Sequence, residues 1–257
     1  MGFNQYIYHI ESLRTSIKSK HDRIMLLKGR FMNKTLLHLI ERFATKDHKA
    51  VKDEIFCMSK DSLEATFLDL LTMYMNDRNS STLRETITVT LSGYTLHEKK
   101  LGFNGYRQSA PDKPEEYCEA KPVNVRFDEE TQKYKRILQG AGNFSDYTFE
   151  RLDKDLESNP RMLVSGFAEG KLLYILSFPF SCLRKALETQ LFKQFPNRQR
   201  QKNSYFRSAN FNYKDFKDCS ELEVVFISEE IDDYAKALNK GFFSWLTEIK
   251  KNRQQVG

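Results

Sequence analysis

Glu119 and Lys121 are the two residues of this chain whose types and spacing are best suited to chemistry. They stand in the run 116–122, which is predicted to be a short strand. Side chains at positions i and i+2 of a strand project from the same face, so the carboxylate and the ammonium group would point in one direction. Together they could reach one metal-bound water and one phosphate. The pair is half of what a metal-dependent phosphodiester hydrolysis needs.

The composition predicts a globular chain. Its 257 residues are 40% hydrophobic and 13% aromatic, which is enough for a sizeable core. No apolar run is long enough to span a bilayer, and the N-terminus lacks a charged-then-apolar signal. The four cysteines show no paired spacing and the five histidines form no ligand pair at i and i+4. We therefore expect no zinc centre, and a reducing cytoplasm as the compartment.

The charge distribution points to nucleic acid as a partner. The chain has 41 Lys and Arg against 35 Asp and Glu, a net charge of +6. The segment 193–217 holds seven basic residues against one acidic residue, and aromatic residues are interleaved with them. Basic groups attract phosphates, and Arg, Asn and Gln can pair with base edges. The best candidates for DNA contacts in this segment are Arg198, Arg200, Lys202 and Arg207. The alternative is a solvated loop that its aromatic residues anchor to the core.

The first 80 residues are predicted to be a helical N-terminal region. Apolar residues recur at spacings of three and four over residues 6–17, 34–43 and 62–75. Asp61 and Glu64 have the spacing of a capping box that would open the third helix. No Gly-rich or Pro-rich linker follows this region. We therefore expect one domain over residues 1–257, with these helices packed on the rest.

From residue 85 the hydrophobic period changes to that of strands. Residues 86–91 alternate strictly and predict a half-buried strand, and residues 101–107 and 117–121 flank a turn-rich stretch and predict a hairpin. Further helices are predicted at 133–138, 148–156, 181–195 and 231–250, and further strands at 162–167, 171–176 and 223–227. This order predicts an α/β or α+β fold, a central mixed β-sheet flanked by helices.

The chain resembles the PD-(D/E)XK nuclease superfamily, and within it the type II restriction endonucleases. The resemblance lies in an acidic residue and a turn that precede Glu-x-Lys on the second arm of a hairpin. The resemblance implies a catalytic core at 81–180 and a DNA-contacting segment, last strand and C-terminal helices at 181–257. It implies that Glu119 and a first acidic residue bind one or two Mg²⁺ ions, while Lys121 positions or deprotonates the attacking water.

The same resemblance implies a cytoplasmic enzyme that cleaves double-stranded DNA at a short specific sequence. Cutting both strands of a palindrome favours a two-fold homodimer. A DNA methyltransferase is expected in the same system. Two alternatives remain open. One is a repair or structure-directed nuclease of the same fold, and the other is a non-catalytic DNA-binding protein with a degenerate nuclease core.

Two residues compete for the first acidic position. Asp112 follows Pro111 and precedes Glu119 by seven residues. If the hairpin tip is centred near Asp112, however, the neighbour of Glu119 is Asn104, and 102–104 resembles a Gly-x-Asp motif with Asn in place of Asp. Asn offers a neutral carbonyl oxygen, a weaker Mg²⁺ ligand than a carboxylate. We favour Asn104, which also keeps the degenerate alternative open.

Supporting residues come from other parts of the chain. Glu64 resembles the helical Glu that some of these nucleases add to the metal site, although the capping box is its alternative role. Residues 140–148 predict a Gly-rich loop in which Ser145 or Asp146 could cap the next helix. Asn143 in this loop and Arg107 on the first hairpin arm are candidate DNA contacts.

Overall fold

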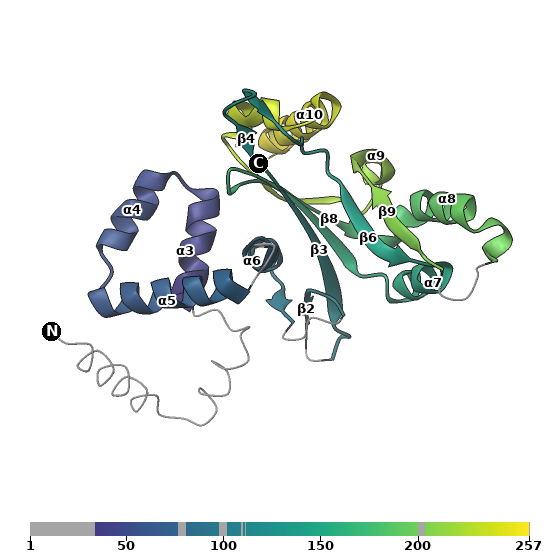
Figure 1. Ribbon diagram of the computed structural model, residues 1–257, viewed down its shortest axis with the longest axis horizontal. Coiled ribbons are helices and arrows are strands. Elements are labelled where there is room, and N and C mark those ends of the chain that lie inside the picture. The colour runs from purple at the N-terminus through teal and green to yellow at the C-terminus, as the bar shows by residue number, and fades with distance from the viewer. Residues whose placement is uncertain are drawn as a thin grey trace.

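Figure 1 shows the computed structural model, in which helices flank a central sheet. The structure describes residues 34–76, 81–97, 102–108, 110, 112–199 and 204–256. Six strands form the central sheet in the order β1-β2-β3-β7-β8-β10. Strands β3 and β7 run parallel, and the other neighbouring pairs of this sheet are antiparallel. The predicted mixed α/β fold is confirmed.

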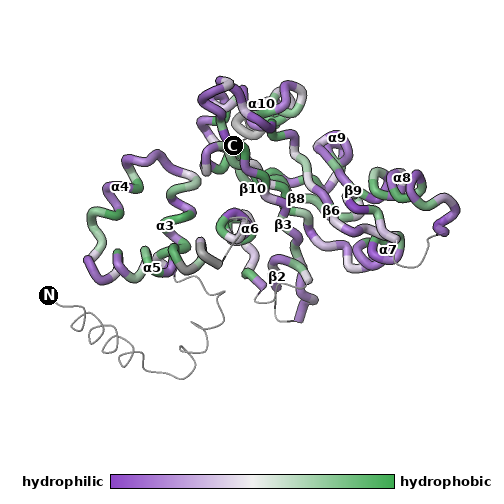
Figure 2. The backbone as a smooth tube through the Cα atoms, viewed as in Figure 1, coloured by the Kyte–Doolittle hydropathy of each residue, from purple (hydrophilic) through white to green (hydrophobic). Residues whose placement is uncertain are grey.

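The second half of the chain contains the strands that its sequence predicts. The central strands β7 and β8 are buried along nearly their whole length, and Figure 2 shows apolar residues gathered along β8. The predicted strands at 162–167, 171–176 and 223–227 are confirmed. The strands of the central sheet are β1 (Thr95–Leu96), β2 (Gly105–Arg107), β3 (Glu116–Val125), β7 (Arg161–Ala168), β8 (Lys171–Pro179) and β10 (Glu223–Ile227). Two further pairs are β4 (Phe127–Asp128) with β5 (Lys133–Tyr134), and β6 (Gly142–Tyr147) with β9 (Phe206–Phe211).

Most helices were also predicted. The predictions at 34–43, 62–75, 148–156, 181–195 and 231–250 are confirmed, whereas the helix expected at 6–17 lies outside the described residues. The α-helices are α3 (Lys34–Thr45), α4 (His48–Phe56), α5 (Lys60–Asn76), α6 (Ser81–Leu91), α7 (Phe149–Ser158), α8 (Arg184–Gln194), α9 (Tyr213–Phe216) and α10 (Lys240–Val256). The 3₁₀ helices are η1 (Phe180–Leu183), η2 (Pro196–Arg198) and η3 (Ile231–Ala237). Among the described residues, no helix combines the length and apolar character needed to cross a membrane.

Strand β3 separates two cores because its side chains alternate between the faces of the sheet. Cys118 and Ala120 belong to the core beneath α6. Glu119 and Lys121 point to the other face, because their register partners in β7, Met162 and Val164, lie in the larger core. That larger core contains side chains from α7, α8, α9, α10 and the β6–β9 pair.

The strand predicted at 86–91 is wrong, since these residues form the second half of α6. Thr88 Oγ1 donates to the Arg84 carbonyl oxygen at 2.7 Å, and Thr90 Oγ1 donates to the Thr86 carbonyl oxygen at 2.9 Å. The Thr90 hydroxyl also lies 2.7 Å from Glu41 Oε1 on α3, so α6 and its neighbour together satisfy these hydroxyl groups. Ile87 is buried in the core between α3, α6 and the sheet. This packing outweighs the modest helix propensity of β-branched residues, which the local pattern alone could not reveal.

Three smaller predictions are also wrong. Residues 133–138 are not helical, because β5 pairs with β4 there. The loop expected at 140–148 contains β6, and α7 is capped by neither Ser145 nor Asp146 but by Thr148, whose hydroxyl accepts the Arg151 N–H at 3.3 Å. Asp61 does not cap α5, because the cap is Ser59, two residues earlier, whose hydroxyl accepts the Ser62 N–H at 3.2 Å.

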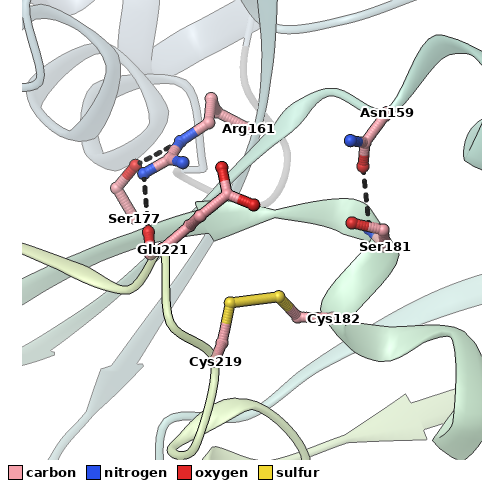
Figure 3. The surroundings of a disulfide bond; sticks show 7 residues. All are labelled: Asn159, Arg161, Ser177, Ser181, Cys182, Cys219 and Glu221. Atoms are coloured by element: carbon pink, nitrogen blue, oxygen red, sulfur yellow. Dashed lines mark hydrogen bonds between the residues drawn. A yellow bond between two sulfur atoms is a disulfide. The ribbon is translucent and has the colours of Figure 1, made fainter.

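Cys182 and Cys219 form a disulfide that their spacing in the sequence did not suggest (Figure 3). The bond joins η1 to the segment between α9 and β10. It departs from the expectation of a reducing compartment, where disulfides are rare. Nearby, Arg161 at the start of β7 donates from Nε to Ser177 Oγ at 3.1 Å and from Nη2 to the Glu221 carbonyl oxygen at 3.2 Å. These contacts hold the segment that leads into β10 against β7 and β8.

A buried hydroxyl pair joins α6 to the sheet and provides a test of this packing. Thr88 Oγ1 lies 2.6 Å from Ser165 Oγ, and both residues are fully buried. Since the Thr88 hydroxyl donates to Arg84, the Ser165 hydroxyl must donate to Thr88. We expect Thr88→Val to leave the buried Ser165 hydroxyl without its acceptor and to lower the free energy of unfolding by about 1–3 kcal/mol.

Ser165→Ala serves as the control, because it leaves the Thr88 donor satisfied and should cost less. The double variant should be more stable than Thr88→Val alone, since it has no Ser165 hydroxyl left without an acceptor. Urea unfolding of the three variants measures these differences. Equal losses in the two single variants and additive loss in the double variant would contradict the assignment.

Candidate active site

Glu119 and Lys121 are ion-paired on one face of β3, as the alternation predicted. Lys121 Nζ lies 2.7 Å from Glu119 Oε1, and the two side chains are 20% and 21% exposed respectively. The ammonium group also lies 4.8 Å from the centroid of the Phe144 ring, within the range of a cation–π contact. The pair is therefore partly shielded from solvent and held in a defined place, while part of each side chain stays accessible.

The hairpin brings Asn104 beside Glu119, which confirms the predicted neighbour. Gly105 pairs with Cys118 in the antiparallel register of β2 and β3, so the next step along the hairpin aligns Asn104 with Glu119. Asn104 Oδ1 accepts the Ala120 N–H at 2.9 Å. Its Nδ2 donates to Glu85 Oε2 at 3.4 Å. The amide is thus anchored at the edge of β3, between a backbone donor and a carboxylate.

Asp112 lies at the exposed hairpin tip, away from Glu119. It follows β2 and precedes β3, beyond the Arg107–Glu116 pair that ends the ladder. The three residues from Glu116 to Glu119 alone span about 10 Å of strand. The structure therefore does not bring Asp112 to the Glu119–Lys121 pair, and of the two competing positions Asn104 is the one beside it.

Glu64, the predicted helical metal ligand, does not lie on the helix that directly precedes the first strand. It lies on α5, is exposed, and forms an i, i+4 ion pair with Lys60 at 3.7 Å. The helix before β1 is α6, and its acidic residue near the site is Glu85, the partner of Asn104. Glu85 was not predicted, because the residues that follow it were expected to form a strand. Its contact with Asn104 depends on the helix α6 that they form instead.

Asp155 is a second carboxylate near the pair, and it was not predicted. Tyr147 Oη donates to its Oδ2 at 2.9 Å, and Arg151 Nε lies 3.8 Å from the same oxygen. Burial raises the pKa of Asp155, and the negative charge of Glu119 raises it further. The Tyr147 hydrogen bond and the positive charges of Arg151 and Lys121 oppose that rise. Asp155 therefore interacts electrostatically with both members of the β3 pair.

The position of Asp155 follows from the apolar face of α7. Phe149 and Leu152 are buried, and residues three apart on a helix share a face. Asp155, three residues after Leu152, is thus directed toward the core side rather than toward solvent. A carboxylate in register with the apolar residues of a helix was the signal in the sequence that could have identified it.

Two of the predicted DNA contacts are used within the protein. Arg107 pairs with Glu116 and lies 4.5 Å from the centroid of the Tyr94 ring. Arg198 pairs with Asp153 at 3.0 Å and also lies over an aromatic ring. The other predicted contacts differ in placement. Arg207 is exposed on β9 and Asn143 is exposed on β6, whereas Arg200 and Lys202 lie outside the described residues.

Cys118 is a free thiol next to Glu119 in the sequence, but it is not suited to nucleophilic chemistry. It points into the core beneath α6, and burial raises its pKa to about 12. A nucleophilic cysteine needs a stabilised thiolate and access to substrate. The site therefore offers carboxylate, amide and ammonium groups as its chemistry.

The oxygen donors of the candidate site suit a hard cation such as Mg²⁺. In the part of the chain that the structure describes, no three His, Cys, Asp or Glu side chains come together as a potential metal site. Mg²⁺, however, is commonly held by one or two carboxylates together with waters and substrate phosphates. Glu119 and Asp155 are two carboxylates whose charges interact.

No protein-family model matches the chain, and no curated protein matches it in sequence.

The hydrogen bond from Tyr147 to Asp155 gives a prediction about pH dependence. A carboxyl group whose pKa is raised by folding stabilises the protein fully below its unfolded pKa of about 3.9, and this contribution is lost as pH rises through the folded pKa. Tyr147→Phe removes the donor and should raise the pKa of Asp155 further. The variant should therefore lose more unfolding free energy, relative to the unmodified protein, at neutral pH than in mild acid.

Urea unfolding at the two pH values measures this difference, and carboxyl NMR titration gives the pKa directly. Tyr134→Phe on β5 is the control, and its loss should not depend on pH in this way. An equal loss for Tyr147→Phe at both pH values would contradict the coupling.

Proposed function

We propose that this protein is a Mg²⁺-dependent endonuclease that cleaves double-stranded DNA at a short specific sequence, as type II restriction endonucleases do. The observation that carries the proposal is the Glu119–Lys121 pair, 2.7 Å apart on one face of β3. The Asn104 hairpin arm beside it and the Asp155 carboxylate near it support the same chemistry. The resemblance of the hairpin to the PD-(D/E)XK superfamily supports the choice of DNA as substrate.

Glu119 and Asp155 are the side chains that would hold Mg²⁺, since both offer hard oxygen donors. When bound, the ion would supply an activated water and would offset negative charge on the phosphate. The two carboxylates come from different elements, β3 and α7. Their mutual repulsion, part of the raised pKa of Asp155, is what a bound cation would relieve.

Lys121 supplies positive charge without acting as a metal ligand. Its ammonium group has three donors and no acceptor, so it can donate to a phosphate oxygen and to the attacking water. The contacts with Glu119 and the Phe144 ring hold it at this position. In the hydrolysis, Lys121 would stabilise the charge that grows on the phosphate, and Glu119 would orient the water.

Asn104 supports a second candidate function, DNA binding by a degenerate nuclease core. It stands where the resembling family carries an acid, and its amide is neutral. Both polar ends of its side chain have protein partners, Ala120 N–H and Glu85. A site with this amide would hold Mg²⁺ less tightly than one with a third carboxylate.

Several parts of the proposal rest on the resemblance and on charge rather than on the site. The net charge of +6 and the exposed Arg207 favour a polyanion as partner. A two-fold homodimer suits the cutting of both strands of a palindrome. A partner DNA methyltransferase and a cytoplasmic location complete the proposal. In the cytoplasm the Cys182–Cys219 disulfide would face reducing conditions.

Substitution of the β3 pair tests the catalytic assignment. Glu119→Gln and Lys121→Met should each lower the rate of Mg²⁺-dependent DNA cleavage by at least about 100-fold, because each removes a group that acts on the reacting water or phosphate. Lys113→Ala, at the exposed hairpin tip, is the matched control and should cut at the unmodified rate.

Cleavage of plasmid DNA of mixed sequence, followed on gels, measures these rates. Discrete fragments from the unmodified protein support a restriction enzyme, a smear supports a nuclease without sequence preference, and binding without cutting supports the degenerate core. Unchanged cutting by both variants would rule out the proposed site.

Asn104→Asp tests whether the hairpin position faces the metal. The substitution replaces a donor to Glu85 with a second carboxylate, so it should lower thermal stability in the absence of divalent ions. Mg²⁺ should restore that stability, and a ligand at 100 times its Kd contributes about 2.7 kcal/mol. Cutting should increase in parallel.

Thermal unfolding with and without MgCl₂, together with the plasmid assay, provides both readouts. Asp112→Asn is the control and should change neither. The Asn104 assignment fails if Mg²⁺ stabilises Asn104→Asp no more than the unmodified protein and cutting does not rise.

A further inference from the structure

Strands β6 and β9 form a two-stranded ribbon beside β3, here called the β6–β9 ribbon (Figure 1). Its inward side chains, among them Phe144, Ala209 and Phe211, are buried in the larger core. Its outward side consists of two cross-strand pairs, Asn143 with Asn210 and Ser145 with Ser208. Asn143, Ser145 and Asn210 are exposed.

The outward row is polar but uncharged, and hydrogen bonds order it. Asn143 Nδ2 donates to Ser208 Oγ at 3.4 Å, and Asn210 Nδ2 donates to the Ser208 carbonyl oxygen at 3.0 Å. The four side chains of the row are neutral, whereas the adjoining residues Asp146 and Arg207 are charged and exposed. Amide and hydroxyl groups of this kind offer both donors and acceptors.

The outer edge of the ribbon is held in place by α8. Gln190 Nε2 donates to the Asn210 carbonyl oxygen at 2.7 Å, and Gln190 Oε1 accepts the Asn210 N–H at 2.9 Å. The side chain thus takes the place of a neighbouring strand. This fixes the backbone of β9 and, with it, the direction of the outward row.

Both ends of β6 adjoin the candidate active site. Gly142 approaches β3 so closely that a Cβ atom there would lie 3.2 Å from Lys121 Cβ. At the other end, Arg151 Nη1 donates to the Ser145 carbonyl oxygen at 2.9 Å. Arg151 lies one turn before Asp155 on α7 and faces the same carboxylate. The ribbon therefore runs alongside the Glu119–Lys121–Asp155 group.

We infer that the outward face of the β6–β9 ribbon reads base edges in the major groove of double-stranded DNA. The inference rests on the proposed nuclease function and assigns its sequence specificity to Asn143, Ser145, Ser208 and Asn210. The major groove admits a two-stranded ribbon, Asn pairs in bidentate fashion with adenine, and Ser bonds to several bases. Neutral side chains suit base readout, whereas phosphates call for basic groups such as the exposed Arg207.

The test selects bound sequences from a random pool of duplex DNA in MgCl₂, with Glu119→Gln as a non-cleaving background. This background should enrich a short motif. Adding Asn143→Ala or Asn210→Ala should each relax the preference at one base pair about tenfold, while affinity for unselected DNA changes little. Asn252→Ala, an exposed amide on α10, is the matched control and should retain the motif. Circular dichroism and thermal unfolding establish that each variant is folded.

Arg207→Ala gives the complementary readout, a uniform loss of affinity with a smaller salt dependence. An unchanged motif in both ribbon variants, while the unmodified protein cuts DNA, overturns the ribbon assignment and leaves the nuclease proposal standing. Binding without any enriched motif also overturns the ribbon assignment. If the unmodified protein cuts no DNA but the motif still relaxes in the ribbon variants, the ribbon assignment holds and the nuclease proposal fails.

Discussion

The parallel pairing of β3 with β7 is the constraint on which the candidate site depends. Parallel neighbours cannot be joined by a tight turn, so the chain must leave the end of β3 and return to the start of β7 through a long crossover. That crossover includes β6 and α7, and both contribute to the core on the face that carries Glu119 and Lys121. The same connection that completes the sheet thus delivers Phe144, Tyr147 and Asp155 to the pair.

Electrostatic balance decides how these groups can share one place. Lys121 neutralises Glu119, while Asp155 relies on Tyr147 and Arg151 for donors and positive charge. On the other side of the pair, the neutral Asn104 donates to Glu85. Three carboxylates, Glu119, Asp155 and Glu85, thus lie on or beside β3, and each has a hydrogen-bond donor or a positive charge as its partner.

The opposite face of β3 serves stability rather than chemistry. Cys118 and Ala120 pack under α6, and the buried Thr88–Ser165 hydroxyl pair joins α6 to β7. Helix α6 also carries Glu85 to the edge of β3, so its packing on the sheet positions one acid of the site. The two faces are therefore coupled through a single strand whose side chains alternate between them.

Elements with local signals could be predicted from the amino-acid sequence. Short-range periodicity indicates the β7 and β8 strands and the apolar face of α7. It also indicates the alternation that places Glu119 and Lys121 on one face and the hairpin that aligns Asn104. Residues 86–91 are helical because burial against the sheet and hydrogen bonds to carbonyl groups four residues earlier outweigh their strand-like pattern, and that burial appears only in the folded chain. The tertiary structure also decided what depends on distant partners. Strand β6 pairs with β9 about 60 residues later, Cys182 bonds with Cys219, and Asp155 and Glu85 approach β3 from helices on its opposite faces. Such contacts arise from packing in three dimensions, which periodicity along the chain does not encode.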